Sequence, residues 1–158
     1  MSNYTPQELN VIAEAPVLTG LAVSLVDLGI VSAVTEAAAL STQLVGAAKK
    51  YPNNTIIQSV FSEAAFKSGA AKLQKPEINS EEVQSGAIVD RAIASINAAL
   101  TMLQGKAASE EIQEYKAFIY TIAEAVANAA GSGLFGSGAK VSDKEAAALA
   151  KLKAALAV

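Results

Sequence analysis

The sequence predicts an all-α protein, and three observations carry this prediction. Ala, which has the highest helix propensity, is the most frequent of the 158 residues. Apolar residues recur at helical spacing along most of the chain. Helix start and stop signals divide the chain into about six segments, with hardly a strand pattern among them. We therefore expect a compact bundle of about six helices that occupies residues 1–158 as a single helical domain.

The first helix is expected to begin at Pro6. Thr5 is a typical N-cap, Pro6 suits the first helical position, and Glu8 completes a capping box. Pro16 then removes one backbone donor and clashes with the preceding turn. We therefore expect a kink or a break there, before a second piece over 17–26.

Two further helices are expected in the first half of the chain. The first, over 30–50, has apolar residues at spacings of four and three, namely Ala33, Ala37, Leu40, Leu44 and Ala47. Two lysines and then Pro52 end it. The second begins near Asn54 or Thr55 and should bury Ile57, Val60, Phe61 and Ala64. Residues 69–80 are the best candidate for a long loop.

The helices expected over 80–104 and 110–130 form an antiparallel hairpin in this interpretation. Asn79 with Glu82 caps the first, and a Gln-Gly pair ends it. Both carry apolar seams at spacings of three and four: Val89, Ala92, Ile96, Ala99 and Leu103 in the first, and Ile112, Tyr115, Ile119, Ile122 and Val126 in the second. The short connector favours neighbouring antiparallel packing. A last helix follows the capping box of Ser142 and Glu145.

The composition excludes several kinds of chemistry. The chain has no Cys and no His, so one chain cannot form disulfides, thiol or Ser-His-Asp relays, or zinc sites of the usual ligands. The net charge is −3 and the basic residues are scattered, which argues against nucleic acid as a partner. No basic residue precedes an apolar run at the N-terminus, so we expect a cytoplasmic protein rather than one with a signal peptide.

A glycine-rich segment follows the helix over 110–130. Gly131, Gly133 and Gly136 match the dinucleotide-binding pattern, but a strand should precede that pattern and none is expected here. We interpret the segment as a helix C-cap whose Leu134 and Phe135 fill an apolar groove. The alternative is a partner or anion loop formed by the same residues with Lys140.

Both ends of the chain resemble an uncharacterised family of small Ala-rich bacterial all-helical proteins. The resemblance rests on the entry TPQELNVIAEAPVLTGLAVSLVD, with its T-P-x-E start and A-P break, and on the C-terminal segment GSGLFGSGAKVSDKEAAALAKLKAAL. It implies a bacterial helical domain. No activity is known for the family, so the resemblance implies no catalytic, cofactor or metal-binding residue.

Residues 15–34 are apolar apart from Asp27 and are long enough to span a membrane. The central acid and the lack of basic or aromatic flanks favour a buried helix over a membrane-associating one. The acidic group Glu110, Glu111 and Glu114 is interpreted as a solvated helix N-terminus rather than a metal or acid-base site.

Basic residues near the C-terminus gather on one helix face. Lys140, Lys144 and Lys151 could face an acidic partner or a lipid surface, although a solvated face is the simpler interpretation. Arg91 is the only arginine and has no acidic neighbour at helical spacing, so we expect it to form a tertiary salt bridge.

No pattern resembles a preorganised polar site, so we expect no enzyme, no catalytic residue and no cofactor. The leading hypothesis is a non-enzymatic helical-bundle protein that acts through self-association, as a homodimer, or through contact with another helical protein. The alternative is a carrier or sensor of an apolar ligand or a membrane surface. An enzyme that uses a buried carboxylate such as Asp27 is the third possibility.

Overall fold

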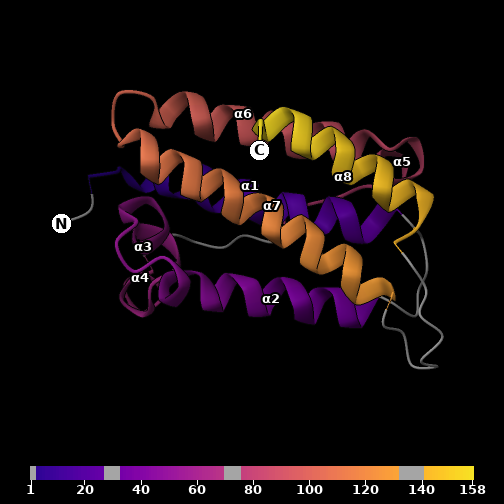
Figure 1. The fold of residues 1–158 in the computed structure, drawn as a ribbon, viewed down its shortest axis with the longest axis horizontal. Helices are drawn as coiled ribbons and strands as arrows, with labels where there is room; N and C mark the ends of the chain where they lie inside the picture. Colours follow the sequence, from indigo (N-terminus) through magenta and orange to yellow (C-terminus); the bar gives the residue numbers. More distant parts are fainter. Residues whose placement is uncertain (1–2, 27–32, 70–75, 132–140) are drawn as a thin grey trace.

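The computed structural model describes residues 3–26, 33–69, 76–131 and 141–158, and within these ranges it contains eight helices and no strand (Figure 1). The helices are α1 (Pro6–Val26), α2 (Ala33–Lys50), α3 (Thr55–Phe61), α4 (Glu63–Ser68), α5 (Ser80–Ser85), α6 (Ala87–Leu103), α7 (Ser109–Gly131) and α8 (Asp143–Leu156). The all-α prediction is confirmed. The number of helices exceeds six because two predicted segments each divide in two.

The central element of the bundle is α1. Its buried residues are spread around the whole helix, namely Leu9, Ile12, Ala13, Ala15, Pro16, Leu18, Thr19, Gly20, Ala22 and Val23. A helix that is apolar all round belongs in an interior. In the bundle α1 packs against α2, α6, α7 and α8, and also touches α3 and α5. Figure 1 shows α1 running behind α7, with α6 on one side and α2 on the other.

The expected break at Pro16 does not occur, because α1 continues from Pro6 to Val26 with Pro16 buried inside it. A proline at position 16 leaves the carbonyl of Ile12 without its helical N–H donor. The hydroxyl of Tyr115 on α7 supplies the missing donor, at 2.6 Å from that carbonyl oxygen. Both side chains are fully buried. A tertiary hydrogen bond thus replaces the one that proline removes, and the helix can continue.

The predicted hairpin is only partly correct. The chain does reverse between α6 and α7 (Figure 1), but these two helices do not pack along one another, and each packs on α1 and α8 instead. The prediction that the helices over 80–104 and 110–130 pack directly against one another is therefore wrong. The apolar seams of both helices are buried except for Ile112, which is partly buried, and α1 packs against both helices because it has apolar surface on every side.

Glycine and serine divide two of the predicted helices. Gly86 adopts a left-handed conformation (φ 75°, ψ 4°) and separates α5 from α6. Ser62 ends α3 with an extended backbone and caps α4 through its hydroxyl. The new start shifts the buried position by one residue, so Ala65 is buried and Ala64, expected in the core, is exposed.

The local capping predictions are confirmed. The side chain of Asn79 accepts a hydrogen bond from the Glu82 N–H, and the Glu82 carboxylate accepts one from the Asn79 N–H. Ser142 and Glu145 form the same reciprocal pair at α8. Thr5 and Glu8 do so at α1. Each cap satisfies helix N–H groups that have no partner within the helix.

Candidate functional site

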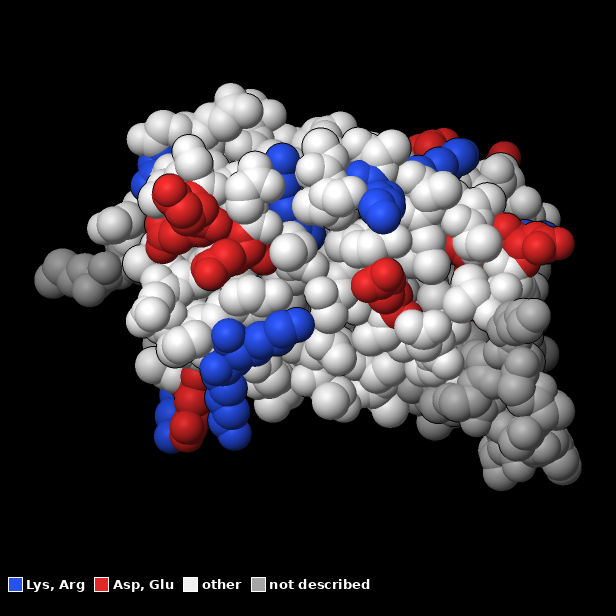
Figure 2. Space-filling model, viewed as in Figure 1, with Lys and Arg blue, Asp and Glu red and all other residues white. Residues whose placement is uncertain are grey.

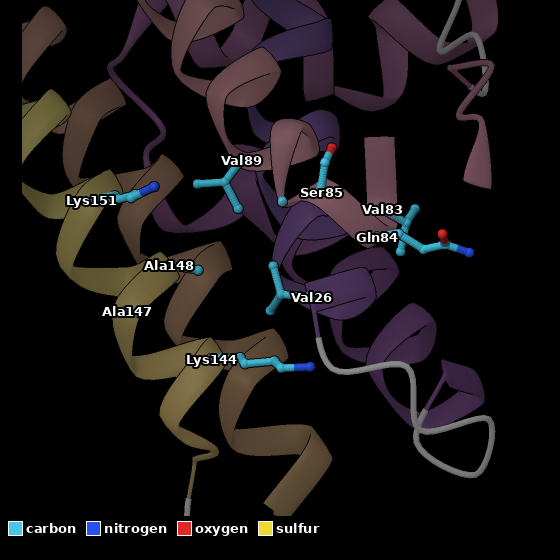
Figure 3. Close-up of a pocket in the computed structure, with 10 residues that line it drawn as sticks. Val26, Val83, Gln84, Ser85, Val89, Lys144, Ala147, Ala148 and Lys151 are labelled. Carbon is cyan, nitrogen blue, oxygen red and sulfur yellow. The ribbon is translucent and has the colours of Figure 1, made fainter. Parts of the chain in front are cut away.

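The best candidate site is a cleft between α8 on one side and α1, α5 and α6 on the other (Figure 3). Its volume is about 290 Å³. The lining residues are Val26 from α1, Val83, Gln84 and Ser85 from α5, Gly86, Val89 from α6, and Lys144, Ala147, Ala148 and Lys151 from α8. The cleft thus joins residues from parts of the fold that are far apart in sequence.

One face of α8 sets the shape of the cleft. Lys144 and Lys151 are seven residues apart, which is two helical turns or about 10 Å along the axis. Between them the same face carries Ala147 and Ala148, whose small side chains leave room in front of the helix. Both lysine side chains extend from α8 toward α1 and α6 (Figure 3). The capping box at Ser142 fixes the start of this helix beside the cleft.

The cleft is positively charged. Its lining includes two ammonium groups and, among the residues that the structure describes, no carboxylate. Neither lysine forms an ion pair within the described ranges, whereas Lys67, Arg91 and Lys106 pair with Glu63, Glu82 and Glu8. The two positive charges therefore lack a counter-charge there, and a bound anion would supply one.

The remaining lining is mainly apolar. Val26 and Val89 lie across the cleft from the alanines of α8, and Val83 adds a third valine to the lining. The hydroxyl of Ser85 donates to the carbonyl of Glu81, so it serves the backbone of α5, and the amide of Gln84 points away from α8 (Figure 3). Apolar walls with a few placed polar groups are typical of small-molecule sites, and the volume is near the lower end of their usual range of about 300–1,000 Å³. The arrangement can hold a short apolar group together with one anionic group.

A second cavity, of about 550 Å³, lies near the N-terminus and beside α3 and α4. Its lining is rich in amides and hydroxyls, but several already serve the backbone. Gln58 donates to two carbonyls at the end of α2, Ser59 donates to Ile56, and Ser62 caps α4. These groups stabilise the ends of helices, so the cavity offers fewer polar groups to a ligand than its composition suggests.

The acidic group at the start of α7 has a structural role that the sequence did not show. Glu111 accepts hydrogen bonds from the N–H of Ala108 at the start of its own helix and from the N–H of Thr55 at the start of α3. Burial alone would raise the pKa of Glu111, but the hydrogen bonds from Thr55 and Ala108 outweigh it and lower this pKa. One carboxylate thus stabilises the positive ends of two helix dipoles.

The neighbouring Glu114 extends this clamp. Its carboxylate accepts a hydrogen bond from the side chain of Asn54, which also donates to the carbonyl of Glu111 and accepts from the Ile57 N–H. Asn54 is 1% exposed, so its side chain makes these bonds away from water. Glu110 and Glu114 are exposed, as expected for a solvated helix N-terminus, whereas Glu111 is partly buried.

The glycine-rich loop lies almost wholly outside the described residues. Gly131 ends α7, while Gly133, Leu134, Phe135, Gly136 and Lys140 fall within residues 132–140. The partner or anion loop therefore stays a prediction. Asp27 also lies outside the described ranges, and within them no cluster of three or more acidic side chains is arranged to hold a metal ion.

The described parts of the apolar segment 15–34 belong to α1, up to Val26, and to α2, from Ala33, and residues 27–32 lie outside the described ranges. One described helix, α1, is long and apolar enough to cross a membrane by length and composition. More than half of its most apolar window, 56%, is buried inside the bundle. That burial is typical of the core helix of a globular protein, which passes the same test.

No family model, curated protein or solved structure matches the chain. The resemblance to an Ala-rich bacterial family therefore stays a prediction, and function must be inferred from the geometry of the cleft. The sequence predicts one wall of it, since the spacing of Lys144 and Lys151 places them on one helix face. The opposite wall was missed, although the Ser85-Gly86 pair was an available signal for it.

Proposed function

We propose that this protein is a non-enzymatic carrier or sensor of a small amphiphilic anion. The observation that carries the proposal is the cleft in which Lys144 and Lys151 flank an apolar lining. An apolar chain would lie against the valines and alanines, and its anionic group would be held by one or both ammonium groups. The proposal involves no chemical step.

The charge of the cleft favours an anion over a neutral apolar ligand. Two positive side chains that share a cleft repel one another and are relieved by a negative partner. Lys144 and Lys151 are exposed, and an exposed ion pair contributes about 1 kcal/mol or less. Each lysine should therefore account for up to about a fivefold change in affinity.

Calorimetric titration with decanoate, a straight-chain carboxylate, tests the proposal. We expect decanoate to bind with one site per chain, and decanol, which has the same chain without the charge, to bind at least about tenfold more weakly. Replacing both lysines, in K144Q/K151Q, should reduce decanoate affinity to the level of decanol. The matched control for Lys151→Gln is Lys153→Gln, which removes one positive charge from the same helix at a position outside the cleft.

The proposal fails if decanol binds as tightly as decanoate, because the charge would then have no role. It also fails if K153Q weakens binding as much as K151Q does, since the effect would then come from net charge alone. Lys153 suits this control because its ammonium lies over the ring of Tyr120, 5.7 Å from the ring centroid, rather than in the cleft.

Self-association or binding to another helical protein stays a prediction. Among the described residues, the exposed large apolar side chains are Val45, Phe66 and Val158, which belong to α2, α4 and the C-terminus. On the face shown in Figure 2, acidic and basic side chains are interspersed with wide uncharged areas. Light scattering over a range of protein concentrations tests this prediction, and a protein that stays monomeric throughout would contradict the homodimer.

A further inference from the structure

The helix α5 forms one wall of the cleft and is the least embedded of the helices around it. Val83, Gln84 and Ser85 of α5 line the cavity, yet none of its residues is buried. It packs mainly against α6, the next helix along the chain, and more lightly against α1. A short helix without a buried side chain has little hydrophobic free energy to hold it in place.

The joint between α5 and α6 is a single glycine. Gly86 has φ 75° and ψ 4°, a left-handed conformation that glycine adopts without the penalty that other residues incur. No heavy atom outside its immediate neighbours lies within 4 Å of the position where a Cβ would be. The space beside the joint, on the side of the missing Cβ, is therefore open.

Two side chains tie this segment to the body of the bundle: Ile78, which is partly buried against the core, and Arg91. Arg91 on α6 donates a hydrogen bond of 2.7 Å to the carbonyl of Glu77, which precedes α5. The same guanidinium nitrogen lies 3.4 Å from the carboxylate of Glu82 in α5. The expected tertiary salt bridge of Arg91 is thus confirmed. Both side chains are about one-third exposed or less, at 34% and 26%, so water reaches the pair and can compete for it.

We propose that α5 is a gate to the cleft, hinged at Gly86 and latched by Arg91. With the latch made, Val83 and its neighbours close the wall opposite α8. When it breaks, rotation about Gly86 moves that wall away from Lys144 and Lys151 and widens the cleft around the ligand. The role of the gate rests on the proposed function, whereas its motion does not.

Distance measurements between spin labels test the motion directly. The chain has no cysteine, so two introduced cysteines can be labelled specifically. Glu81→Cys on α5 with Asn128→Cys on α7 reports the gate, and Asn97→Cys on α6 with Asn128→Cys is the reference pair; all three side chains are exposed. We expect Arg91→Gln to raise the population of the longer 81–128 distance about fivefold, with the 97–128 distance unchanged.

A second latch variant separates loss of charge from loss of the cap. Glu82→Gln removes the ion pair, but Gln at this position still completes a capping box with Asn79. It should widen the 81–128 distribution in the same direction as Arg91→Gln. A matched control is Lys106→Gln, which breaks the ion pair with Glu8 and should leave the 81–128 distance as it is.

The gate is refuted if neither latch variant changes the 81–128 distance, or if the reference pair changes equally, because the whole bundle would then have loosened. Rates of decanoate exchange give the functional readout. In Arg91→Gln, association and dissociation should both accelerate about fivefold, with little change in affinity. If decanoate does not bind the wild-type protein while the labels report opening, the proposed function fails and the hinge motion stands.

Discussion

The hydrogen bond between Tyr115 and the carbonyl of Ile12 gives the sharpest prediction about stability. Tyr115→Phe removes only a hydroxyl, so the packing of the ring is kept. It leaves the Ile12 carbonyl in the core without a donor, because Pro16 cannot supply one. Leaving a buried acceptor unpaired costs about 1–3 kcal/mol. For a chain of this length, that loss lowers Tm by about 2–12 °C.

A double-mutant cycle separates this effect from the ordinary loss of one hydroxyl. In Pro16→Ala, residue 16 regains an N–H that can donate to the Ile12 carbonyl in the normal helical pattern. Tyr115→Phe should therefore cost less in the Pro16→Ala background, about 0.5–1.5 kcal/mol, because no acceptor is left unpaired. Urea denaturation of the four proteins, followed by circular dichroism, gives the free energies of unfolding.

The matched control is Tyr120→Phe, which removes a hydroxyl from the same helix at a partly exposed position and should change the free energy of unfolding by less than about 0.5 kcal/mol. An equal cost of Tyr115→Phe in the wild-type and Pro16→Ala backgrounds would refute the role assigned to the hydroxyl. Burial also raises the pKa of Tyr115 well above 10. Because the pKa of Tyr115 is higher in the folded than in the unfolded chain, the buried neutral hydroxyl contributes its full stabilisation below pH 10. That stabilisation is lost as the pH rises above 10.

Two further predictions concern glycine and acid. A Cβ at Gly20 would lie 2.5 Å from a methyl carbon of Leu40, whereas at Gly46 it would meet nothing within 4 Å. Both Ala variants gain the same helix propensity, so any difference between them reflects the clash at Gly20. In thermal unfolding, the free energy of unfolding of Gly20→Ala should be about 1–3 kcal/mol below that of Gly46→Ala. Equal stabilities would contradict the close approach of α1 and α2. The ammonium of Lys106 and the backbone at the N-cap lower the pKa of Glu8 to about 2, below its value in the unfolded chain. The ionised Glu8 carboxylate therefore stabilises the fold above about pH 4.5, and this stabilisation is lost as the pH falls toward 2. Glu8→Gln should flatten the acid side of the stability profile, and an unchanged profile would show that the carboxylate is not held in this way.

The parts of the fold that depend on neighbouring residues were predictable. The caps at Thr5, Asn79 and Ser142 were found because each depends on residues within one turn. The apolar seams were also found, because helical spacing alone selects the buried face.

The parts that depend on distant residues were not predictable. Pro16 carries a local signal for a break, and only the hydroxyl of Tyr115, far along the chain, shows why the helix continues. A seam likewise shows which face is buried but not which helix covers it, so α6 and α7 were paired with one another instead of with α1.

In the cleft, too, the features that depend on neighbouring residues were predictable and those that depend on distant residues were not. The positive face of α8 was evident from the seven-residue spacing of its lysines, while the apolar wall opposite depends on how α5 and α1 are placed. The sequence also suggested that Glu111 faces solvent, because a helix N-terminus satisfies a carboxylate without any other partner. Its second role, at the N-terminus of α3, depends on a contact with Thr55 that local pattern does not encode.

Methyl NMR spectroscopy can show whether the amphiphilic anion binds in the cleft beside α8. Val26, Val83 and Val89 each contribute methyl groups to the cleft. Titration with decanoate should shift these resonances together and saturably, and should leave those of Val45 and Val60, outside the cleft, in place. In K144Q/K151Q the same shifts should need at least about tenfold more decanoate to reach half saturation. Saturable shifts at Val60, on the helix beside the second cavity, without shifts at the three cleft valines would contradict the assignment of the site.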